Sequence, residues 1–461
     1  MKLEKISVKE FLSRSKAGDV DVEDFLTHVI ENSKSIQKKY NPFITLTDKL
    51  QEPKKKGKLF GLPISVKDNI CTKGIQTTAG SRILENYIPP FSATPVDNVV
   101  NEGAFILGKT AMDEFGFGTF SVNCAYGIPK NPLDAERSCG GSSGGAGCVT
   151  AVADFPHIAL AESTGGSISC PASFTGTVGL TPTYGLVSRW GLIDYANSLD
   201  KIGCIGKTVY DVALMLSLIA GNDSKDSTSL NTPKQDYTNF LKKDIKGMKI
   251  GVPKEYFENV DEKITKVIWN AIKKLEDLGA TYKEVSLPHT KYALPSYYII
   301  AVAEASTNLA KYTGMRYGLH LELKGNFDDY FSVVRSNGFG EEAKRRIILG
   351  TFARMAGYRD AYYLKALKVR TKVIEDFKKA FKQFDVLAAP TMPVVAPRFD
   401  EIEKLSPIEV YMMDVLTVAP NLAGIPMISV PAGEVDKMPV GLHLMGDHLQ
   451  EGNILQVAKQ V

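Results

Sequence analysis

Glycine is distributed very unevenly along this chain of 461 residues. Of its 39 glycines, 18 lie between Gly103 and Gly206, in less than a quarter of the sequence. Glycine adopts backbone conformations that other residues avoid, and it lets the backbone approach a ligand closely. We therefore expect this stretch to contain the tight turns of the fold and its chemically active site.

The flanking parts of the chain show helix and strand patterns. Residues 1–58 are expected to be a helical segment, because Ser7 and Glu10 form a capping-box pattern and the apolar residues of 22–30 share one helical face. A strand–helix–strand unit is predicted at residues 248–252, 264–278 and 281–287. Later elements are helices within 341–384 and strands at 386–389, 427–430 and 440–445. The sequence predicts an α/β fold.

Composition excludes several classes of protein. The 55 Lys and Arg residues nearly balance the 52 Asp and Glu residues, and a net charge of +3 does not by itself indicate nucleic-acid binding. The most apolar stretch, Val212 to Ala220, is about half of the roughly 20 residues that a membrane helix needs. The N-terminus does not resemble a signal peptide, and the six cysteines show neither a CxxC pair nor zinc-finger spacing. We predict a cytoplasmic protein with reduced thiols, no membrane span and no metal site.

Two motif matches are rejected on their context. Residues 103–110 fit the phosphate-binding pattern GxxxxGK[ST], but the apolar run inside them is typical of a buried strand rather than a phosphate loop. Residues 140–144 fit the GxSxG nucleophile elbow, but a polar loop precedes them instead of a hydrophobic strand. None of the six histidines lies in a glycine-rich or acidic loop, so a catalytic base other than histidine is expected.

Three segments carry the candidate chemistry: Gly61 to Asn69 with its Val-Lys-Asp, Cys139 to Gly145 with Gly-Gly-Ser-Ser-Gly-Gly, and Thr164 to Ile168 with Thr-Gly-Gly-Ser-Ile. A serine hydroxyl is a weak nucleophile until a base removes its proton. A lysine can be that base only when it is uncharged, which burial favours. Lys67 follows an apolar run and fits this role. Without other signals, Lys67 would be interpreted as a surface residue at the end of a strand. The two serine motifs favour the interpretation of Lys67 as the base.

Together these segments resemble the amidase signature family, whose hydrolytic centre is a serine, a second serine in a cis peptide and a lysine. The resemblance implies that Ser167 is the nucleophile, Ser142 the cis serine that relays the proton, and Lys67 the base; Ser143 competes with Ser142. It also implies an oxyanion hole made by the backbone N–H groups of Thr164, Gly165, Gly166 and Ser167.

The chain departs from the family pattern at one point. Where the family usually has Asp before Thr-Gly-Gly-Ser, this sequence has Glu162-Ser163. The carboxylate that helps to orient the oxyanion loop is therefore expected to be missing or displaced to Glu162.

Outside the signature, residues 183–192, 198–203 and 338–363 resemble one branch of the family, the A subunits of the glutamyl-tRNA(Gln) amidotransferases. The resemblance spans essentially the whole chain. It implies an amidase signature fold with a mixed β-sheet core covered by helices on both faces. It also implies a single amidase domain over residues 1–461, with a glycine-rich signature core at 59–220 and a helix-rich remainder with closing strands at 245–461.

In that branch the chain is a glutaminase that forms a glutamyl-enzyme and supplies ammonia to a partner. The resemblance assigns Arg346 and Asp414 to the charged α-groups of glutamine, with Tyr297 nearby. It implies B and C partner subunits, with tRNA bound mainly by the partner. No cofactor is expected in this chain, and ATP and Mg²⁺ are expected only at a partner subunit.

Two alternatives stay open at this point. One is a stand-alone amidase that acts on a small apolar or aryl amide. The other is a catalytically idle scaffold subunit, against which the intact Lys67, Ser142 and Ser167 argue.

Overall fold

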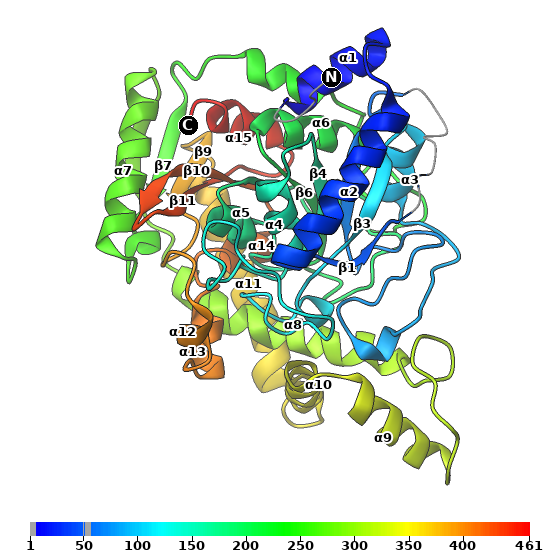
Figure 1. Cartoon of the computed structure of the whole chain (residues 1–461). Coiled ribbons are helices and arrows are strands. Elements are labelled where there is room, and N and C mark those ends of the chain that lie inside the picture. Colours follow the sequence, from blue (N-terminus) through cyan, green and yellow to red (C-terminus); the bar gives the residue numbers. More distant parts are fainter. Residues whose placement is uncertain (1–5, 49, 51–56) are drawn as a thin grey trace.

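The computed structural model describes residues 6–48, 50 and 57–461, which fold around one sheet of 11 strands (Figure 1). The strand order is β1-β3-β2-β4-β6-β5-β10-β11-β9-β7-β8. Their bounds are β1 Phe43–Leu46, β2 Pro63–Lys67, β3 Phe105–Thr110, β4 Ile158–Ser163, β5 Val178–Thr181, β6 Lys201–Gly206, β7 Lys249–Pro253, β8 Thr281–Val285, β9 Val386–Pro390, β10 Met427–Val435 and β11 Met438–Met445. The pairs β2–β3, β2–β4, β7–β8 and β7–β9 are parallel and the others antiparallel, so the predicted mixed sheet is confirmed.

Helices precede, connect and follow the strands along the chain. Their bounds are α1 Val8–Ala17, α2 Val22–Tyr40, α3 Thr94–Asn101, α4 Gly144–Val152, α5 Ser169–Thr175, α6 Val209–Ile219, α7 Glu262–Asp277, α8 Ala293–Asn308, α9 Phe327–Gly338, α10 Glu341–Arg354, α11 Lys365–Ala380, α12 Phe399–Ile402, α13 Pro407–Met412, α14 Val418–Ala423 and α15 Glu451–Ala458. Within the described ranges, no helix is both long and apolar enough to cross a bilayer.

Alternating strand residues build a separate core on each face of the sheet. In β9, Val386 and Ala388 join the cluster that includes α2, α6, α7 and α15, whereas Leu387 and Ala389 join the cluster formed with α8, α11 and α14. This period of two is what a strand buried on both faces produces. The prediction of helices on both faces is confirmed.

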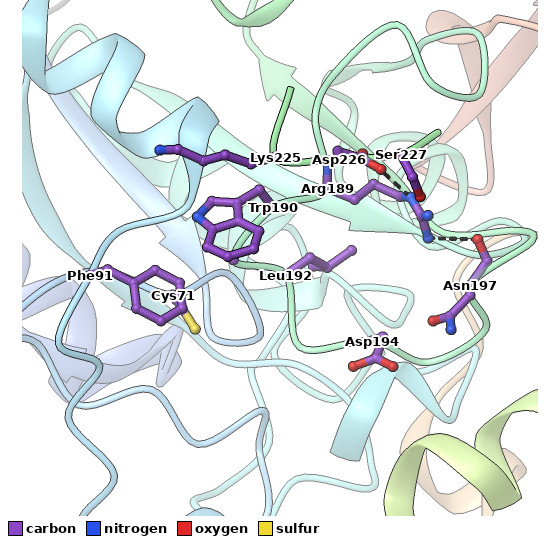
Figure 2. Close-up of a pocket in the computed structure, with 11 residues that line it drawn as sticks. Cys71, Phe91, Arg189, Trp190, Leu192, Asp194, Asn197, Lys225, Asp226 and Ser227 are labelled. Atoms are coloured by element: carbon purple, nitrogen blue, oxygen red, sulfur yellow. Dashed lines mark hydrogen bonds and ion pairs between the residues drawn. The ribbon is translucent and has the colours of Figure 1, made fainter. Parts of the chain in front are cut away.

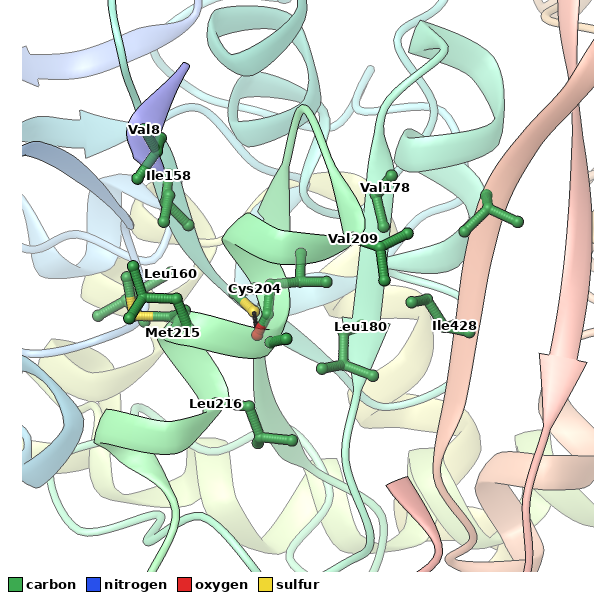
Figure 3. Packing of buried hydrophobic residues seen from close by; sticks show 14 of the residues in the cluster. Val8, Ile158, Leu160, Val178, Leu180, Cys204, Val209, Met215, Leu216 and Ile428 are labelled. Atoms are coloured by element: carbon green, nitrogen blue, oxygen red, sulfur yellow. Dashed lines mark hydrogen bonds between the residues drawn. The ribbon is translucent and has the colours of Figure 1, made fainter. Parts of the chain in front are cut away.

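The first of these clusters shows how the signature half of the chain is held (Figure 3). Residues Met215 and Leu216 of α6 lie against strand side chains that include Leu160, Leu180 and Cys204. The helix therefore covers β4, β5 and β6 and anchors the strand from which the loop with Ser167 emerges. The apolar stretch around Val212 is a buried core helix, as predicted.

Several local predictions are confirmed. The side chain of Ser7 caps α1 by accepting the N–H of Glu10, and β7, α7 and β8 form the expected parallel strand–helix–strand unit. The phosphate-loop match is a buried strand, because Lys109 lies in β3 and its Nζ donates to the carbonyl of Ile70 at 2.6 Å. The six cysteines are free.

The prediction of a purely helical N-terminal segment is wrong in one respect. Residues 43–46 form β1, which pairs antiparallel with β3 at the edge of the sheet. Residues 1–5, 49 and 51–56 of that segment lie outside the described part of the chain. The single-domain organisation stays a prediction, and one sheet that runs from β1 to β8 supports it.

Candidate active site

Two neighbouring parallel strands bring the predicted catalytic residues to one edge of the sheet. Lys67 is the last residue of β2, and Ser167 lies in the loop between β4 and α5. Strands β2 and β4 are parallel, so their carboxyl ends meet at the same edge, where α/β sheets usually place their sites. Ser142 enters from the glycine-rich loop before α4.

Lys67 contacts Ser142 directly. Its side chain is fully buried, and Nζ lies 2.7 Å from Oγ of Ser142. Nζ also lies 2.9 Å from the carbonyl oxygen and 2.8 Å from Oε2 of Glu162. The ammonium can therefore donate to three acceptors, while the uncharged amine can accept the Ser142 proton. A base for serine chemistry needs that second arrangement.

The cis peptide bond lies between Gly141 and Ser142, so the prediction that the first serine of the pair follows it is confirmed. Ser143, the competing residue, donates its hydroxyl to the carbonyl of Glu162 at 3.1 Å, and its N–H donates to the carbonyl of Ser167 at 3.2 Å. Ser143 therefore ties the two serine segments together. The catalytic roles of Lys67, Ser142 and Ser167 remain predictions.

The Thr-Gly-Gly-Ser loop is held in place by its carbonyl groups. Ser163 donates to the Gly165 carbonyl at 2.9 Å, and the Asn421 amide donates to the Thr164 carbonyl. Among the described residues, no acceptor faces the backbone N–H groups of Gly165, Gly166 or Ser167. These donors are free to bind a developing negative charge, as the predicted oxyanion hole requires.

The carboxylate of Glu162, the residue at the departure from the family pattern, contacts both the oxyanion loop and the proposed base. It contacts the loop, because Thr164 Oγ1 lies 2.8 Å from its Oε1, and it also contacts Lys67 and Asn69 through Oε2. The expectation that the carboxylate is displaced to Glu162 fits this arrangement. The contact with Lys67 was not expected.

Arg346 is a buried cation beside the site. Its Nε donates to Glu342 at 2.8 Å and its Nη1 to the Tyr195 hydroxyl at 2.5 Å, and the guanidinium lies 5.1 to 5.7 Å from four aromatic ring centroids. Those rings belong to Phe117, Tyr195, Tyr298 and Tyr411. Its Nη2 has no acceptor among the described residues, which leaves it available to an anionic ligand group.

Asp414 lies close enough to Arg346 for the guanidinium to influence its carboxyl, but burial dominates and raises its pKa. Oδ1 of Asp414 accepts from Thr119 at 3.1 Å, and Oδ2 accepts from the hydroxyl of Tyr298 at 2.6 Å. Tyr297 instead lies over the oxyanion loop, where a Cβ built on Gly165 would be 2.9 Å from its hydroxyl. The sequence placed Tyr297 nearby but gave no indication of Tyr298, Tyr195 or Glu342.

A cavity of about 570 Å³ opens beside Arg346 and is lined also by Gly118, Thr119, Phe120 and Tyr411. It is large enough for a small ligand. A second cavity of about 390 Å³ lies apart and contains none of the predicted site residues (Figure 2). In this second cavity Arg189 forms an ion pair with Asp226 and donates a hydrogen bond to the carbonyl of Asn197. Among the described residues, no group of three or more His, Cys, Asp or Glu side chains could hold a metal ion.

Comparisons with known proteins place the chain in a family. The family described as Amidase matches residues 7–455. The glutamyl-tRNA(Gln) amidotransferase A subunit of Carboxydothermus hydrogenoformans is 47% identical over 99% of this chain and 97% of its own, and that of Methanosarcina barkeri is 49% identical over 98% and 94%. The crystal structure of the corresponding protein from Thermotoga maritima has a TM-score of 0.84 at 38% identity, covering 99% of this chain and 94% of its own. The chain belongs to the amidase family.

Proposed function

We propose that this chain is the glutaminase component of a glutamyl-tRNA(Gln) amidotransferase. The observation that carries the proposal is the pair of opposite charges beside the lysine–serine centre. Arg346 has a free guanidinium nitrogen, and the half-buried Asp414 has its carboxyl within electrostatic reach of that guanidinium. A free amino acid presents a carboxylate and an ammonium group, which suit these two side chains. The near-full-length likeness to amidotransferase A subunits supports the same function.

The proposed reaction uses the serine–lysine centre. Ser167 Oγ attacks the side-chain amide carbon of glutamine. The Ser167 proton passes to Ser142 and then to Lys67, whose Nζ lies 2.7 Å from Oγ of Ser142. The N–H groups of the 164–167 loop stabilise the oxyanion. Ammonia takes up a proton from the relay and leaves, so a glutamyl ester remains on Ser167. Water then hydrolyses the ester by the same proton path in reverse.

The released ammonia is used by a partner. We propose that B and C subunits assemble with this chain, that ATP, Mg²⁺ and most tRNA contacts belong to the partner, that this chain carries no cofactor, and that the complex is cytoplasmic. Two charged groups at the substrate end argue against a stand-alone amidase for apolar or aryl amides, because an apolar ligand offers no partner to the free Nη2 of Arg346 or to the carboxyl of Asp414.

The test is Ser167→Ala in the assembled complex. Glutamine hydrolysis should be abolished, while amidation driven by added ammonium should persist, since the second active site lies in the partner. Loss of both activities together in a folded, assembled complex contradicts a separate glutaminase role.

A further inference from the structure

The carboxylate of Glu162 lies directly behind the proposed base. Its Oε2 is 2.8 Å from Nζ of Lys67 and accepts the Asn69 amide at 3.0 Å, and both charged side chains are buried. With Lys67 as an ammonium, Nζ donates to this carboxylate. Lys67 cannot accept a serine proton in that form, so it must first lose one, and the Glu162 carboxylate is an acceptor in direct contact with it.

A second carboxyl group shares a threonine hydroxyl with Glu162. Oγ1 of Thr164 lies 2.8 Å from Oε1 of Glu162 and 2.8 Å from Oδ1 of Asp200. A threonine hydroxyl has one proton and can donate to only one of these oxygens. The other contact is a hydrogen bond only if that carboxyl carries a proton. The geometry therefore places one proton on the Glu162–Asp200 pair.

The surroundings decide which carboxyl holds this proton. Oε2 of Glu162 receives two donors, from Lys67 and Asn69, and a proton on that oxygen would oppose both of them. Burial, followed by the charge of Glu162, raises the pKa of Asp200 well above its usual range, although two backbone N–H groups point at it. Among the described residues, other charged or titratable groups that act on this cluster include Arg189 and Tyr184 near Asp200, and Asp113 near Lys67.

We propose that Glu162 is the proton acceptor behind Lys67, and that Asp200, as a carboxylic acid, orients it through Thr164. This inference rests on the proposed serine–lysine mechanism. In the resting site Asp200 donates to Thr164, Thr164 donates to Glu162, and Lys67 is an ammonium. One proton then moves from Nζ to Oε2, which leaves an amine on Lys67 and an acid on Glu162. The amine takes the Ser142 proton as Ser142 takes that of Ser167, and the proton held by Glu162 returns to Lys67 when ammonia leaves.

The test compares pH–rate profiles of kcat/KM for the wild type and Glu162→Gln. Glutamine is isosteric: its amide oxygen can accept from Lys67 and Asn69, and its NH2 group can donate to the Thr164 hydroxyl, but it cannot accept the proton. Lys67 must then release its proton to solvent, so the acid limb should move to higher pH by more than about one unit. At neutral pH, kcat should fall on the order of a hundredfold with little change in KM, and part of the loss should be recovered at alkaline pH.

Two further variants serve as matched controls. Asp200→Asn imitates a carboxylic acid that donates to Thr164, so it should keep the acid limb of the wild type. Glu451→Gln changes another buried glutamate, one that contacts neither Lys67 nor Thr164 and whose charged neighbour is Lys201, so it should leave the profile unaltered. A limb that moves in Asp200→Asn as far as in Glu162→Gln overturns the placement of the proton on Asp200.

An unmoved limb in a folded Glu162→Gln enzyme, with kcat near that of the wild type, overturns the relay. If Glu162→Gln does not fold, infrared difference spectra between the wild type and Asp200→Asn test the protonation of Asp200 instead. A protonated-carboxyl band of the wild type must be absent from Asp200→Asn, and an unchanged band refutes the assignment. The profiles should be recorded with glutamine and with an uncharged amide. The relay acts on both substrates, so the acid limb should shift with either one. Poor selectivity for glutamine would therefore count against the proposed substrate without affecting the evidence for the relay.

Discussion

Replacing Arg346 with methionine should remove glutamine recognition selectively. The guanidinium is only 3% exposed, and its Nη2 is the one nitrogen of the group without an acceptor among the described residues. If Nη2 binds the substrate carboxylate, the variant leaves a buried charge of the ligand unanswered. Losses of that kind are about 2 to 5 kcal/mol, or roughly 30-fold to several thousandfold in kcat/KM. Methionine keeps an apolar stem among the surrounding rings.

The assay measures kcat/KM for glutamine and for a short aliphatic amide without α-charges. Arg346→Met should lower the first by the factor above, mainly through KM, and barely change the second. Arg345→Met is the matched control, because Arg345 lies on the same helix and pairs with the same Glu342 but is 42% exposed, so it should cost less than about 1 kcal/mol. Equal losses on both substrates, or a wild type that prefers the uncharged amide, would refute the reasoning.

Three further outcomes are expected. Lys67→Ala should reduce glutamine hydrolysis as much as Ser167→Ala, and the double variant should be no worse, as steady-state rates will show. Gly166→Ala should abolish turnover because its Cβ would lie 2.4 Å from Oγ1 of Thr417, and adding Thr417→Gly should restore part of the activity. Burial lowers the pKa of His157 to about 3, so the unfolded chain binds more protons than the folded chain between about pH 6.5 and 3. The free energy of unfolding therefore decreases as the pH is lowered through this range. At pH 5 the loss from this one group is about 2 kcal/mol relative to neutral pH. His157→Gln should narrow the gap between the thermal unfolding midpoints at pH 7 and pH 5.

Each of these has a contrary result. Near-normal turnover in Lys67→Ala would remove lysine from the mechanism. Full activity in Gly166→Ala would mean that the loop tolerates displacement and does not need its backbone donors in place. An unchanged gap between the midpoints in His157→Gln would assign the acid sensitivity to other groups.

Local pattern was enough for the elements whose residues lie close together in sequence. The parallel unit of β7, α7 and β8 followed from apolar periodicity and Gly279, and the buried β3 followed from an apolar run that outweighed a motif match. The sequence did not predict strand β1 because its four residues follow a strong helical pattern. They form a strand only by pairing with β3, which lies more than sixty residues later in the sequence. Its existence depends on tertiary pairing rather than on local preference.

The candidate site was predictable where its residues belong to short motifs. Lys67, Ser142 and Ser167 came from such motifs, and the structure brings the first two into contact at 2.7 Å. The substitution at 162–163 indicated a displaced carboxylate, but not that this carboxylate would contact Lys67. No local signal connects Tyr195 with Arg346, which are 151 residues apart in sequence, because long-range packing alone makes that contact.

The most direct test of the account is whether glutamine forms an ester on Ser167. Purified chain with its partner subunits should be mixed with glutamine, quenched in acid, digested and analysed by mass spectrometry. We predict a glutamyl adduct on the peptide that contains Ser167, absent from Ser167→Ala and removed by hydroxylamine. An adduct on another residue, or undiminished glutamine hydrolysis by Ser167→Ala, would contradict the account.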